Sequence, residues 1–411
     1  MNNTNIYEVN IRQYTAEGTI AAFKKHLPRL KEMGVQVLWF MPIHPIGEIN
    51  RKGTLGSYYS IKNYKQVNPE FGNEEDFKDL VETAHSMDMK VIIDWVANHA
   101  AWDNDWTLTN PDFFLRDEAG NFKAPFDWDD VIQVDHSNEM QQDAMIASMQ
   151  FWIDNFDIDG FRADLAHLTP LPFWKNARHL LDTLKPGLIW LAETEEPNYH
   201  EAFDISYTWE WMHACEKFVK KETTVTGLVE LLKRQKENFP LHAMRLFFTT
   251  NHDENSWNGT EYEKFGRLAK AFAVFSFMYG GIPLIYSGQE IPNTKRLKFF
   301  DKDWLEWPDG PALHNFFSTL IEVRLFNPAF PGEINFIEEH AEENILAFKK
   351  RNGDNDLIVL LNLGEIYFDG EFKFDAEGTF IEKFSNASYK VENKRMKVFI
   401  ESGGFLVLEK K

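Results

Sequence analysis

Short apolar runs alternate with stretches of helical periodicity from the start of the chain to residue 325. The runs are rich in β-branched, aromatic and aliphatic residues, and they have the length of strands. Eight such runs are what a closed (β/α)8 barrel requires, so the sequence predicts an α/β fold of the TIM-barrel type. The predicted strands are residues 6–11, 35–41, 89–94, 160–164, 188–193, 203–207, 245–250 and 282–286.

Apolar residues at helical spacing lie between these runs and predict helices that cover the barrel. The uncharged stretch 271–289 has the apolar character of a membrane span, but Gly280-Gly281 and Pro283 divide it. It is therefore predicted to be a buried helix, a turn and a short strand. The helical faces are Phe23, Leu27 and Leu30; Phe77, Leu80, Val81 and Ala84; and Trp174, Ala177, Leu180, Leu181 and Leu184.

Two segments lie outside this alternation. Residues 100–137 are rich in Trp, Asp, Asn and Pro and lack periodicity, which predicts a short inserted subdomain over the barrel mouth after the third strand; a simple long loop is the alternative. Asn327-Pro328 and Pro331-Gly332 mark a boundary. We therefore expect a catalytic barrel from residues 1–99 and 138–328, followed by an antiparallel β-sandwich domain from residues 329–411.

Composition restricts the partners of the chain. The 411 residues carry a formal net charge of −21, which argues against nucleic acid and anionic membranes and favours a neutral substrate. Of the amino acids, 15% are aromatic, and aromatic side chains beyond the needs of the core could stack on sugar rings. The oligomeric state is left open.

Cysteine content and the first residues bear on location. Cys215 is the only cysteine, so an intramolecular disulfide and a cysteine-based zinc site are excluded. Residues 1–10 show neither a basic start nor an apolar stretch, which favours the cytoplasm. A periplasmic or secreted protein whose signal peptide has been removed is the alternative.

Three carboxylates stand where apolar runs end. Asp164, Glu193 and Asp253 follow the runs that begin at Gly160, Leu188 and Leu246. The carboxyl ends of parallel strands converge on one mouth, where catalytic residues of such barrels gather. A cluster of acids there, without a phosphate-binding loop, points to cleavage of a glycosidic bond.

Each acid has a possible role in catalysis, and each role has an alternative. Arg162 shares a strand face with Asp164 and could hold it ionised as a nucleophile, although the two could equally form a structural ion pair. Partial burial of Glu193 would raise its pKa, as a general acid requires, whereas a capping role is the alternative. Asp253 could stabilise positive charge at the anomeric carbon, or it could bind sugar hydroxyls that move in the transition state.

Polar residues also follow the third and seventh predicted strands. Asp94, Asn98 and His99 could line the same mouth, or they could form an ordinary polar transition into a loop. His252 by itself is more typical of a satisfied core histidine. Asn98 carries an oxygen suited to calcium.

Taken in series, these motifs resemble the alpha-amylase family of glycoside hydrolases, family thirteen. The resemblance covers essentially the whole length and rests on these segments: Asp94-Trp95-Val96-Ala97-Asn98-His99, Gly160-Phe161-Arg162-Ala163-Asp164, Glu193, Asn251-His252-Asp253 and the run from Gly281 to Glu290.

The resemblance implies roles for these residues. Asp164 would be the nucleophile, Glu193 the general acid and Asp253 the transition-state stabiliser. Asp94, His99, Arg162 and His252 would contact substrate, and Tyr59 stands where the family has a tyrosine that stacks on the sugar being cleaved.

The implied activity is retaining hydrolysis of α-1,4 bonds in starch, glycogen or maltooligosaccharides. A transglycosylase or an α-1,6-acting glucosidase of the same family is the alternative, and a non-catalytic carbohydrate-binding relative is a more remote one. No cofactor is required for this chemistry.

The sequence also departs from the family. Many members have Lys-His three and four residues after the nucleophile, where this chain has His167-Leu168, so binding on the acceptor side must differ. Leu165 replaces a small residue, which leaves the α-1,4 against α-1,6 preference open. For the family's structural calcium, Asn98 and Asp135 match two ligands. A further ligand would have to come from Asp127, Asp129 or Asp130, and a metal-free structural role for Asn98 is the alternative.

Overall fold

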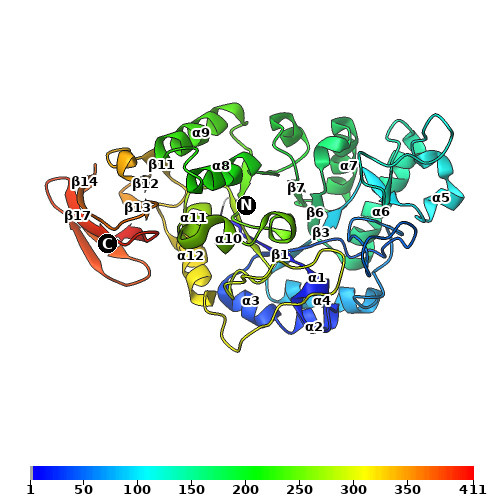
Figure 1. Cartoon of the computed structure of the whole chain (residues 1–411), viewed down its shortest axis with the longest axis horizontal. Coiled ribbons are helices and arrows are strands. Elements are labelled where there is room, and N and C mark those ends of the chain that lie inside the picture. The colour runs from blue at the N-terminus through cyan, green and yellow to red at the C-terminus, as the bar shows by residue number, and fades with distance from the viewer. Residues whose placement is uncertain (1–2) are drawn as a thin grey trace.

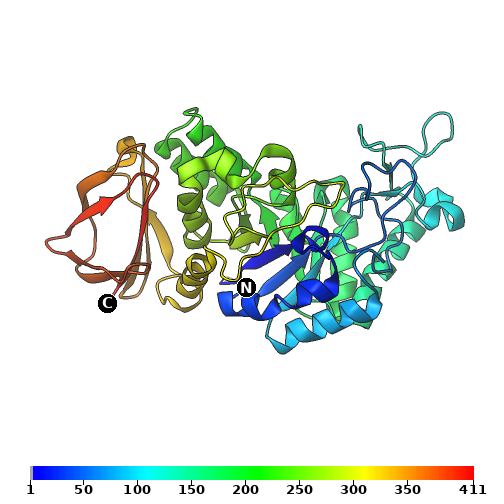
Figure 2. The same cartoon turned by 60° about the horizontal axis from the view of Figure 1, so that its bottom comes forward.

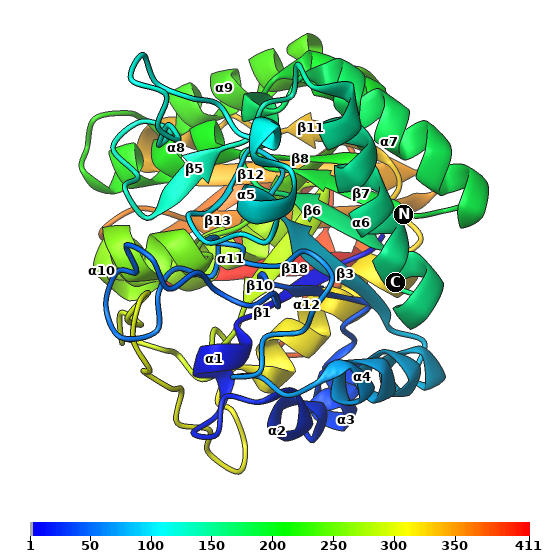
Figure 3. The same ribbon diagram turned by 90° about the vertical axis from the view of Figure 1, so that its right-hand side faces the viewer.

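The computed structural model describes residues 3–411 and contains a closed barrel of eight parallel strands (Figures 1 and 3). Around the barrel the order is β1, β2, β3, β6, β7, β8, β9 and β10, so neighbours in space are also neighbours in sequence, apart from the inserted β4 and β5. All eight predicted strands are confirmed. Their bounds are β1 Ile6–Val9, β2 Val37–Phe40, β3 Lys90–Trp95, β6 Gly160–Ala163, β7 Ile189–Ala192, β8 Ile205–Tyr207, β9 Met244–Phe247 and β10 Ile282–Tyr286.

Helices surround the barrel and bury their apolar faces against it. The face predicted over Phe23, Leu27 and Leu30 is divided into two helices, because the chain turns at Lys25 and His26 before Pro28 opens the next helix. An Asn73–Asp76 capping box fixes the start of α4. The helices are α1 Ile11–Tyr14, α2 Ile20–Lys24, α3 Leu27–Met33, α4 Glu74–Ser86, α6 Glu139–Phe156, α7 Leu171–Leu184, α8 Trp209–Val219, α9 Val225–Asn238, α10 Glu261–Phe265, α11 Ala269–Met278 and α12 His314–Phe326.

The uncharged stretch forms a helix and a barrel strand, as predicted. Helix α11 ends at Met278, and β10 begins at Ile282. Gly281 between them has a φ of 62°, and a Cβ there would lie 2.1 Å from the carbonyl oxygen of Arg245, so only glycine fits this turn. Within residues 3–411, no helix is both long enough and apolar enough to cross a membrane.

The segment after β3 forms a small subdomain in front of the barrel (Figure 3). Strand β4 (His99–Ala101) pairs antiparallel with β5 (Val131–Gln133), and α5 (Trp106–Thr109) lies between them in sequence. Buried Phe113 and Phe114 join this segment to the main core. The segment is therefore packed, not a loose loop.

The C-terminal strands form a lobe at the opposite end of the molecule from the inserted segment (Figures 1 and 2). A six-stranded antiparallel sheet has the order β11-β12-β13-β18-β15-β16, and β14 pairs with β17 in a two-stranded sheet. The bounds are β11 Glu333–Phe336, β12 Ile345–Asn352, β13 Asn355–Asn362, β14 Phe368–Lys373, β15 Gly378–Glu382, β16 Ser388–Val391, β17 Arg395–Ile400 and β18 Phe405–Lys410.

The larger C-terminal sheet buries both faces. Ile358 and Leu360 on β13 join a separate core with Phe372 of β14 and Val398 of β17. Alternate residues of the same strand, such as Val359, face the barrel and belong to its core. This second contact fixes the C-terminal lobe against α11 and the end of the barrel.

Candidate active site

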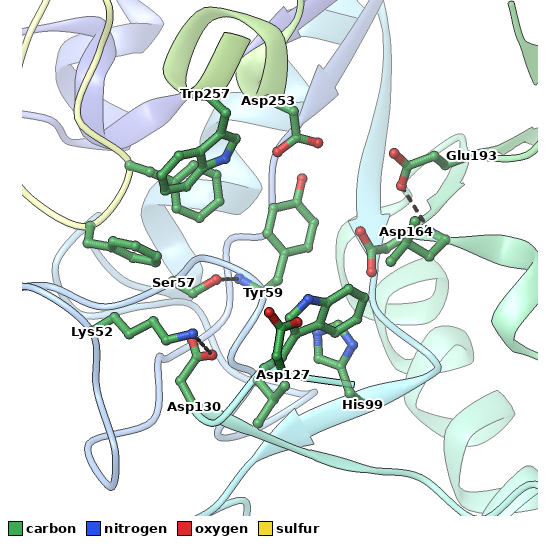
Figure 4. A pocket seen from close by; sticks show the side chains of 15 residues that line it. Lys52, Ser57, Tyr59, His99, Asp127, Asp130, Asp164, Glu193, Asp253 and Trp257 are labelled. Carbon is green, nitrogen blue, oxygen red and sulfur yellow. Dashed lines mark hydrogen bonds and ion pairs between the residues drawn. The ribbon is translucent and has the colours of Figure 1, made fainter. Parts of the chain in front are cut away.

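Three acids meet at the carboxyl ends of the barrel strands (Figure 4). Asp164 directly follows β6 and Glu193 directly follows β7, while Asp253 lies six residues beyond β9 because the chain leaves the sheet after Phe247. All three line one cleft of about 690 Å³. The arrangement predicted from the strand ends is therefore present.

A single buried guanidinium connects the acids of the cleft. Arg162 is fully buried, and its Nη1 donates to Asp94 at 2.9 Å and to Asp164 at 3.1 Å. Its Nη2 lies 2.8 Å from Oε2 of Glu193 in an ion pair. Its Nε donates to the hydroxyl of Tyr207 at 3.2 Å. One positive charge is thus shared by three carboxyl groups.

Burial sets the proton affinity of this cluster. It raises the pKa of Glu193 and of Asp164, and it raises that of Asp94 to about 7; the charge of Arg162 opposes the shift in each case. Arg162 favours the ionised form of Asp164, as expected, but burial opposes it and the same charge also serves Asp94 and Glu193. One cation cannot balance three carboxylates, so the cluster retains protons more readily than isolated carboxyls do.

Asp253 belongs to a second charged cluster. Nε2 of His252 lies 3.2 Å from Asp253, and its Nδ1 contacts the carboxylate of Glu8 on β1. Burial opposes a charge on His252, but Asp253 and Glu8 outweigh it, so the pKa of His252 is raised well above its usual value. Burial would also raise the pKa of Asp253, yet its pKa is lowered by His252. His252 is therefore a charged partner of Asp253.

Glu8 was not found by sequence reasoning. It lies in the buried strand Ile6–Val9 and is itself fully buried. The available signal was a carboxyl group inside an apolar barrel strand, where an acid requires a charged partner. That partner, His252, is 244 residues away.

Tyr59 contacts both clusters from the floor of the cleft. Its hydroxyl donates to Asp94 at 3.1 Å and lies 2.7 Å from Nε2 of His252. Its ring stacks near that of Phe299, with centroids 6.3 Å apart and planes inclined by 14°. Tyr59, Asp94 and His252 are thus brought together by hydrogen bonds, and one of them, Tyr59, lines the cleft.

Asn98 and His99 lie beside the catalytic acids. The side-chain amide of Asn98 donates to Oδ2 of Asp164 at 3.2 Å, and its oxygen contacts Nδ1 of His99. His99 lines the cleft, where its ring meets Trp128 edge to face. Asn98 therefore orients Asp164 directly.

Most of the side chains proposed for calcium are paired with protein groups in this structure. Both polar atoms of Asn98 are used by Asp164 and His99, and Asp135 accepts hydrogen bonds from the backbone and hydroxyl of Ser137. Asp129 and Asp130 both pair with Lys52, at 2.9 and 3.0 Å. Among residues 3–411, no group of three or more His, Cys, Asp or Glu side chains is arranged to hold a metal ion.

Leu165 has a strained backbone conformation next to the acids. Its φ of 38° lies in the left-handed region, which is unusual for a residue other than glycine. Its backbone N–H donates to Oε2 of Glu193 at 2.9 Å. His167, in turn, is exposed. The turn after Asp164 thus aims a hydrogen-bond donor at Glu193, and Leu165 itself forms part of the cleft wall.

Aromatic walls flank the acids, and sequence reasoning did not identify them. Trp257, Phe299 and Phe300 pack against one another on one side, with Trp257 about half exposed. Trp128 and the exposed Phe126 stand in the inserted segment, with ring centroids 5.0 Å apart. Aromatic faces bordering an acidic cleft are suited to the apolar faces of sugar rings.

Fold and site together define a TIM-barrel enzyme with a carboxylate-based centre at the carboxyl ends of its strands. The family model described as "Alpha amylase, catalytic domain" matches residues 2–136 and 126–319. The chain belongs to the alpha-amylase family, and it is a glycoside hydrolase of the alpha-amylase type.

Individual relatives agree with this assignment. The structure is similar to that of a noncanonic maltogenic alpha-amylase from Thermotoga neapolitana, with 32% identity, a TM-score of 0.90 and coverage of 99% of this chain and 98% of the other. Alpha-amylase 2 of Dictyoglomus thermophilum is 24% identical over 93% of this chain and 70% of its own length. An alpha-1,4-glucan:maltose-1-phosphate maltosyltransferase of Rhodospirillum rubrum is 28% identical over 87% of this chain, which spans 56% of that longer protein.

Proposed function

We propose that this protein hydrolyses α-1,4-glucosidic bonds in starch, glycogen or maltooligosaccharides with retention of configuration. The observation that carries the proposal is that Arg162 contacts Asp164 and Glu193 through adjacent nitrogens. One guanidinium holds both carboxyl groups close together. Retaining glycosidases need a separation of about 5 to 5.5 Å, whereas inverting ones need roughly 6.5 to 9.5 Å to admit a water molecule.

In the first step, Asp164 is the nucleophile. Its carboxylate attacks the anomeric carbon and forms a covalent glycosyl-enzyme, while Asn98 and Arg162 fix its direction. Glu193 donates its proton to the departing glycosidic oxygen. Burial keeps that proton available at higher pH, and the N–H of Leu165 orients the carboxyl group.

In the second step, Glu193 acts in the opposite direction. The Glu193 carboxylate takes a proton from a water molecule, and the resulting attack on the anomeric carbon releases Asp164. Asp253, held ionised by His252, stabilises the positive charge that develops on the sugar in both transition states. Tyr59 presents its ring to the sugar at the point of cleavage.

The position of Glu193 gives the cleft a direction. The leaving part of the chain lies on the side of the general acid, so the donor sugars extend toward Lys52 and Trp257 (Figure 4). Lys52 ties the loop after β2 to Asp129 and Asp130 of the inserted segment. This bridge limits the number of glucosyl units on the donor side and favours short products released from a chain end.

Transglycosylation is the second candidate, because a sugar hydroxyl can replace water in the second step. It is favoured by the similarity to a maltosyltransferase and by the exposed aromatic side chain of Phe126 in the inserted segment, on which an acceptor ring could rest. Product analysis on maltoheptaose, with and without an added acceptor sugar, distinguishes the two: transfer products longer than the substrate identify a transferase.

Proton NMR of the first-formed product tests the proposed mechanism. With a maltooligosaccharide substrate, the new reducing end should appear first as the α-anomer and only later equilibrate with the β-anomer. Early β-anomer would show inversion and would contradict the role of Asp164 as a nucleophile.

A further inference from the structure

Two adjoining cavities lie at the end of the barrel opposite the catalytic cleft. They have volumes of about 500 and 240 Å³. Gly280 and Gly281, just before β10 begins, line both, which places the cavities at the amino-terminal ends of the strands. The C-terminal lobe contributes Ile334 of β11 to both walls and Lys350 of β12 to the larger cavity. We call the two together the junction cavity.

The junction cavity has an unusual charge for this protein. The chain has 64 acidic and 43 basic residues, yet no described residue that lines either chamber is acidic. The larger chamber holds Lys350 together with His242, and the smaller one holds Arg245 and Lys236. A negatively charged molecule therefore meets only neutral and basic groups on these walls.

Lys350 is the most informative of these residues. Its side chain is 2% exposed, and its Nζ lies 3.5 Å from the centroid of the Phe330 ring. The guanidinium of Arg324 lies over the same ring at 4.7 Å, so two cations share one aromatic ring. Within residues 3–411, Lys350 forms neither a hydrogen bond nor an ion pair through its amine. A buried ammonium without an anion is costly.

The surroundings of Lys350 also disfavour the protonated form of its amine. Burial, with the charge of Arg324 added to it, lowers the pKa of Lys350 well below its usual value. An anion placed beside the amine would reverse this effect, since it would stabilise the protonated form.

Arg245, in the smaller chamber, is a second basic residue whose hydrogen bonding is incomplete. Its Nη2 pairs with Glu195 at 2.9 Å and its Nε donates to the carbonyl of Tyr207. Its Nη1 is buried and has no hydrogen-bond partner in the described part of the chain. Phe239 covers the guanidinium at 3.6 Å from the ring centroid. Each chamber thus presents a basic nitrogen without an acceptor, the amine of Lys350 in the larger and the buried Nη1 of Arg245 in the smaller.

We propose that the junction cavity binds a small phosphate-class oxyanion, with the amine of Lys350 as its principal charged contact. Phosphate offers several acceptor oxygens, and it meets both the amine of Lys350 and the electrostatic field of the nearby Arg324. The chamber is larger than the ion alone requires, and Tyr279 lines both parts of it. A phosphorylated sugar can therefore place its phosphoryl group at Lys350 and its ring toward Tyr279.

Thermal unfolding of the full chain tests the proposal. Inorganic phosphate, glucose 1-phosphate and chloride are titrated separately at constant ionic strength. Each phosphate compound should raise the melting temperature saturably, by on the order of 2 °C or more, because a ligand held only by the folded state stabilises it. Chloride should give no saturable rise. If neither phosphate compound gives such a rise, the proposal is overturned.

Variants at adjacent positions locate the effect. Lys350→Met should abolish the phosphate-dependent rise, and Lys350→Arg, which keeps the charge, should retain it. Lys349→Met is the matched control: Lys349 is the next residue on β12, points to the other face and donates to the carbonyl of Asp375. An unchanged rise in Lys350→Met, or a loss in Lys349→Met as well, would contradict a site at Lys350.

Two further measurements, the titration midpoints and the hydrolytic activity of the variant, complete the test. A tighter midpoint for glucose 1-phosphate than for inorganic phosphate assigns the site to a phosphorylated sugar, whereas equal midpoints assign it to free phosphate. Lys350→Met should leave the hydrolysis of maltooligosaccharides unchanged without phosphate. Failure of the hydrolytic proposal would appear in the anomer experiment and not in these titrations, so the two can be told apart.

Discussion

At the scale of single residues, Arg162 shows why acids in one cleft can differ in protonation. Its guanidinium contacts Asp94, Asp164 and Glu193, and burial raises the pKa of each of these carboxyls. His252 instead lowers the pKa of Asp253. The ease with which each carboxyl loses its proton therefore depends on how far it must share a neighbouring positive charge with other carboxyls.

Replacing Asp164 by Asn should remove activity without disturbing the fold. The amide cannot form the covalent intermediate, so turnover of maltooligosaccharides should fall on the order of 10³-fold or more. Its shape is nearly that of the carboxylate, and its oxygen can still accept from Arg162. Turnover and circular-dichroism melting are measured together, with Asp143→Asn on the exposed side of α6 as the control. Substantial remaining activity would show that Asp164 is not the nucleophile.

Glu193→Gln should affect substrates according to their leaving group. Hydrolysis of glucans should fall by roughly 10² to 10⁴, whereas an aryl glycoside with an acidic phenol should lose much less, because it needs little protonation. A general acid must be protonated to act. The raised pKa of Glu193 therefore extends glucan activity to higher pH before the alkaline decline begins. Equal losses on both substrates would argue against proton donation by Glu193.

At the scale of elements, the loop after β2 lines one end of the cleft through Lys52. Lys52→Met removes the bridge to Asp129 and Asp130, so longer products and internal cleavage should increase relative to cleavage near chain ends. Partly exposed ion pairs contribute only about 0 to 1 kcal/mol, so the variant should remain folded. Chromatography of the early products of a long maltooligosaccharide measures the change.

Lys62→Met provides a matched comparison for this prediction. Lys62 is equally exposed and also pairs with two carboxylates, Glu48 and Asp103, but it lies outside the catalytic cleft. Its product pattern should match that of the wild type. An altered pattern in both variants, or in neither, would mean that the Lys52 bridge does not set product length.

The strands and their terminal acids could be predicted because they depend on local patterns. Apolar runs marked all eight barrel strands, and Asp164 and Glu193 follow their ends directly. The Glu8–His252 contact could not be predicted. It joins the first barrel strand to the segment after the seventh, and no local sequence pattern indicates a contact between residues so far apart in the chain. Trp257 lies in a short π-helical turn, Glu254–Asn258, and Phe299 in a loop, and neither segment is long enough for a periodic pattern to reveal its aromatic residue.

Prediction from local sequence patterns is limited in the same way for the C-terminal lobe. Strand-like runs at 345–349, 357–362 and 405–408 predict β12, β13 and β18, and runs at 372–374 and 397–400 predict parts of β14 and β17. No such run predicts β11, β15 or β16. Their burial patterns alternate between exposed and half-buried or buried positions, and they include Glu, Lys and Asn. Such strands are defined by their partners in the sheet more than by their own residues.

At the scale of the whole molecule, stability should not depend on calcium. The oxygen of Asn98 contacts His99, Oδ1 of Asp135 accepts from Ser137, and Lys52 pairs with Asp129 and Asp130. Exhaustive chelation should therefore leave the melting temperature and activity unchanged. A fall in melting temperature that added calcium restores would show that the inserted segment rearranges to hold the ion.

The buried thiol of Cys215 can be used to measure how often the packing around α8 opens. The only thiol of the chain lies on α8, is 2% exposed, and has its pKa raised well above the usual value by burial. A thiol reagent should therefore react once per chain, and only when α8 separates from the barrel wall. The labelling rate then measures how often this wall opens, and labelling as fast as that of a free thiol would show that the wall is not closed.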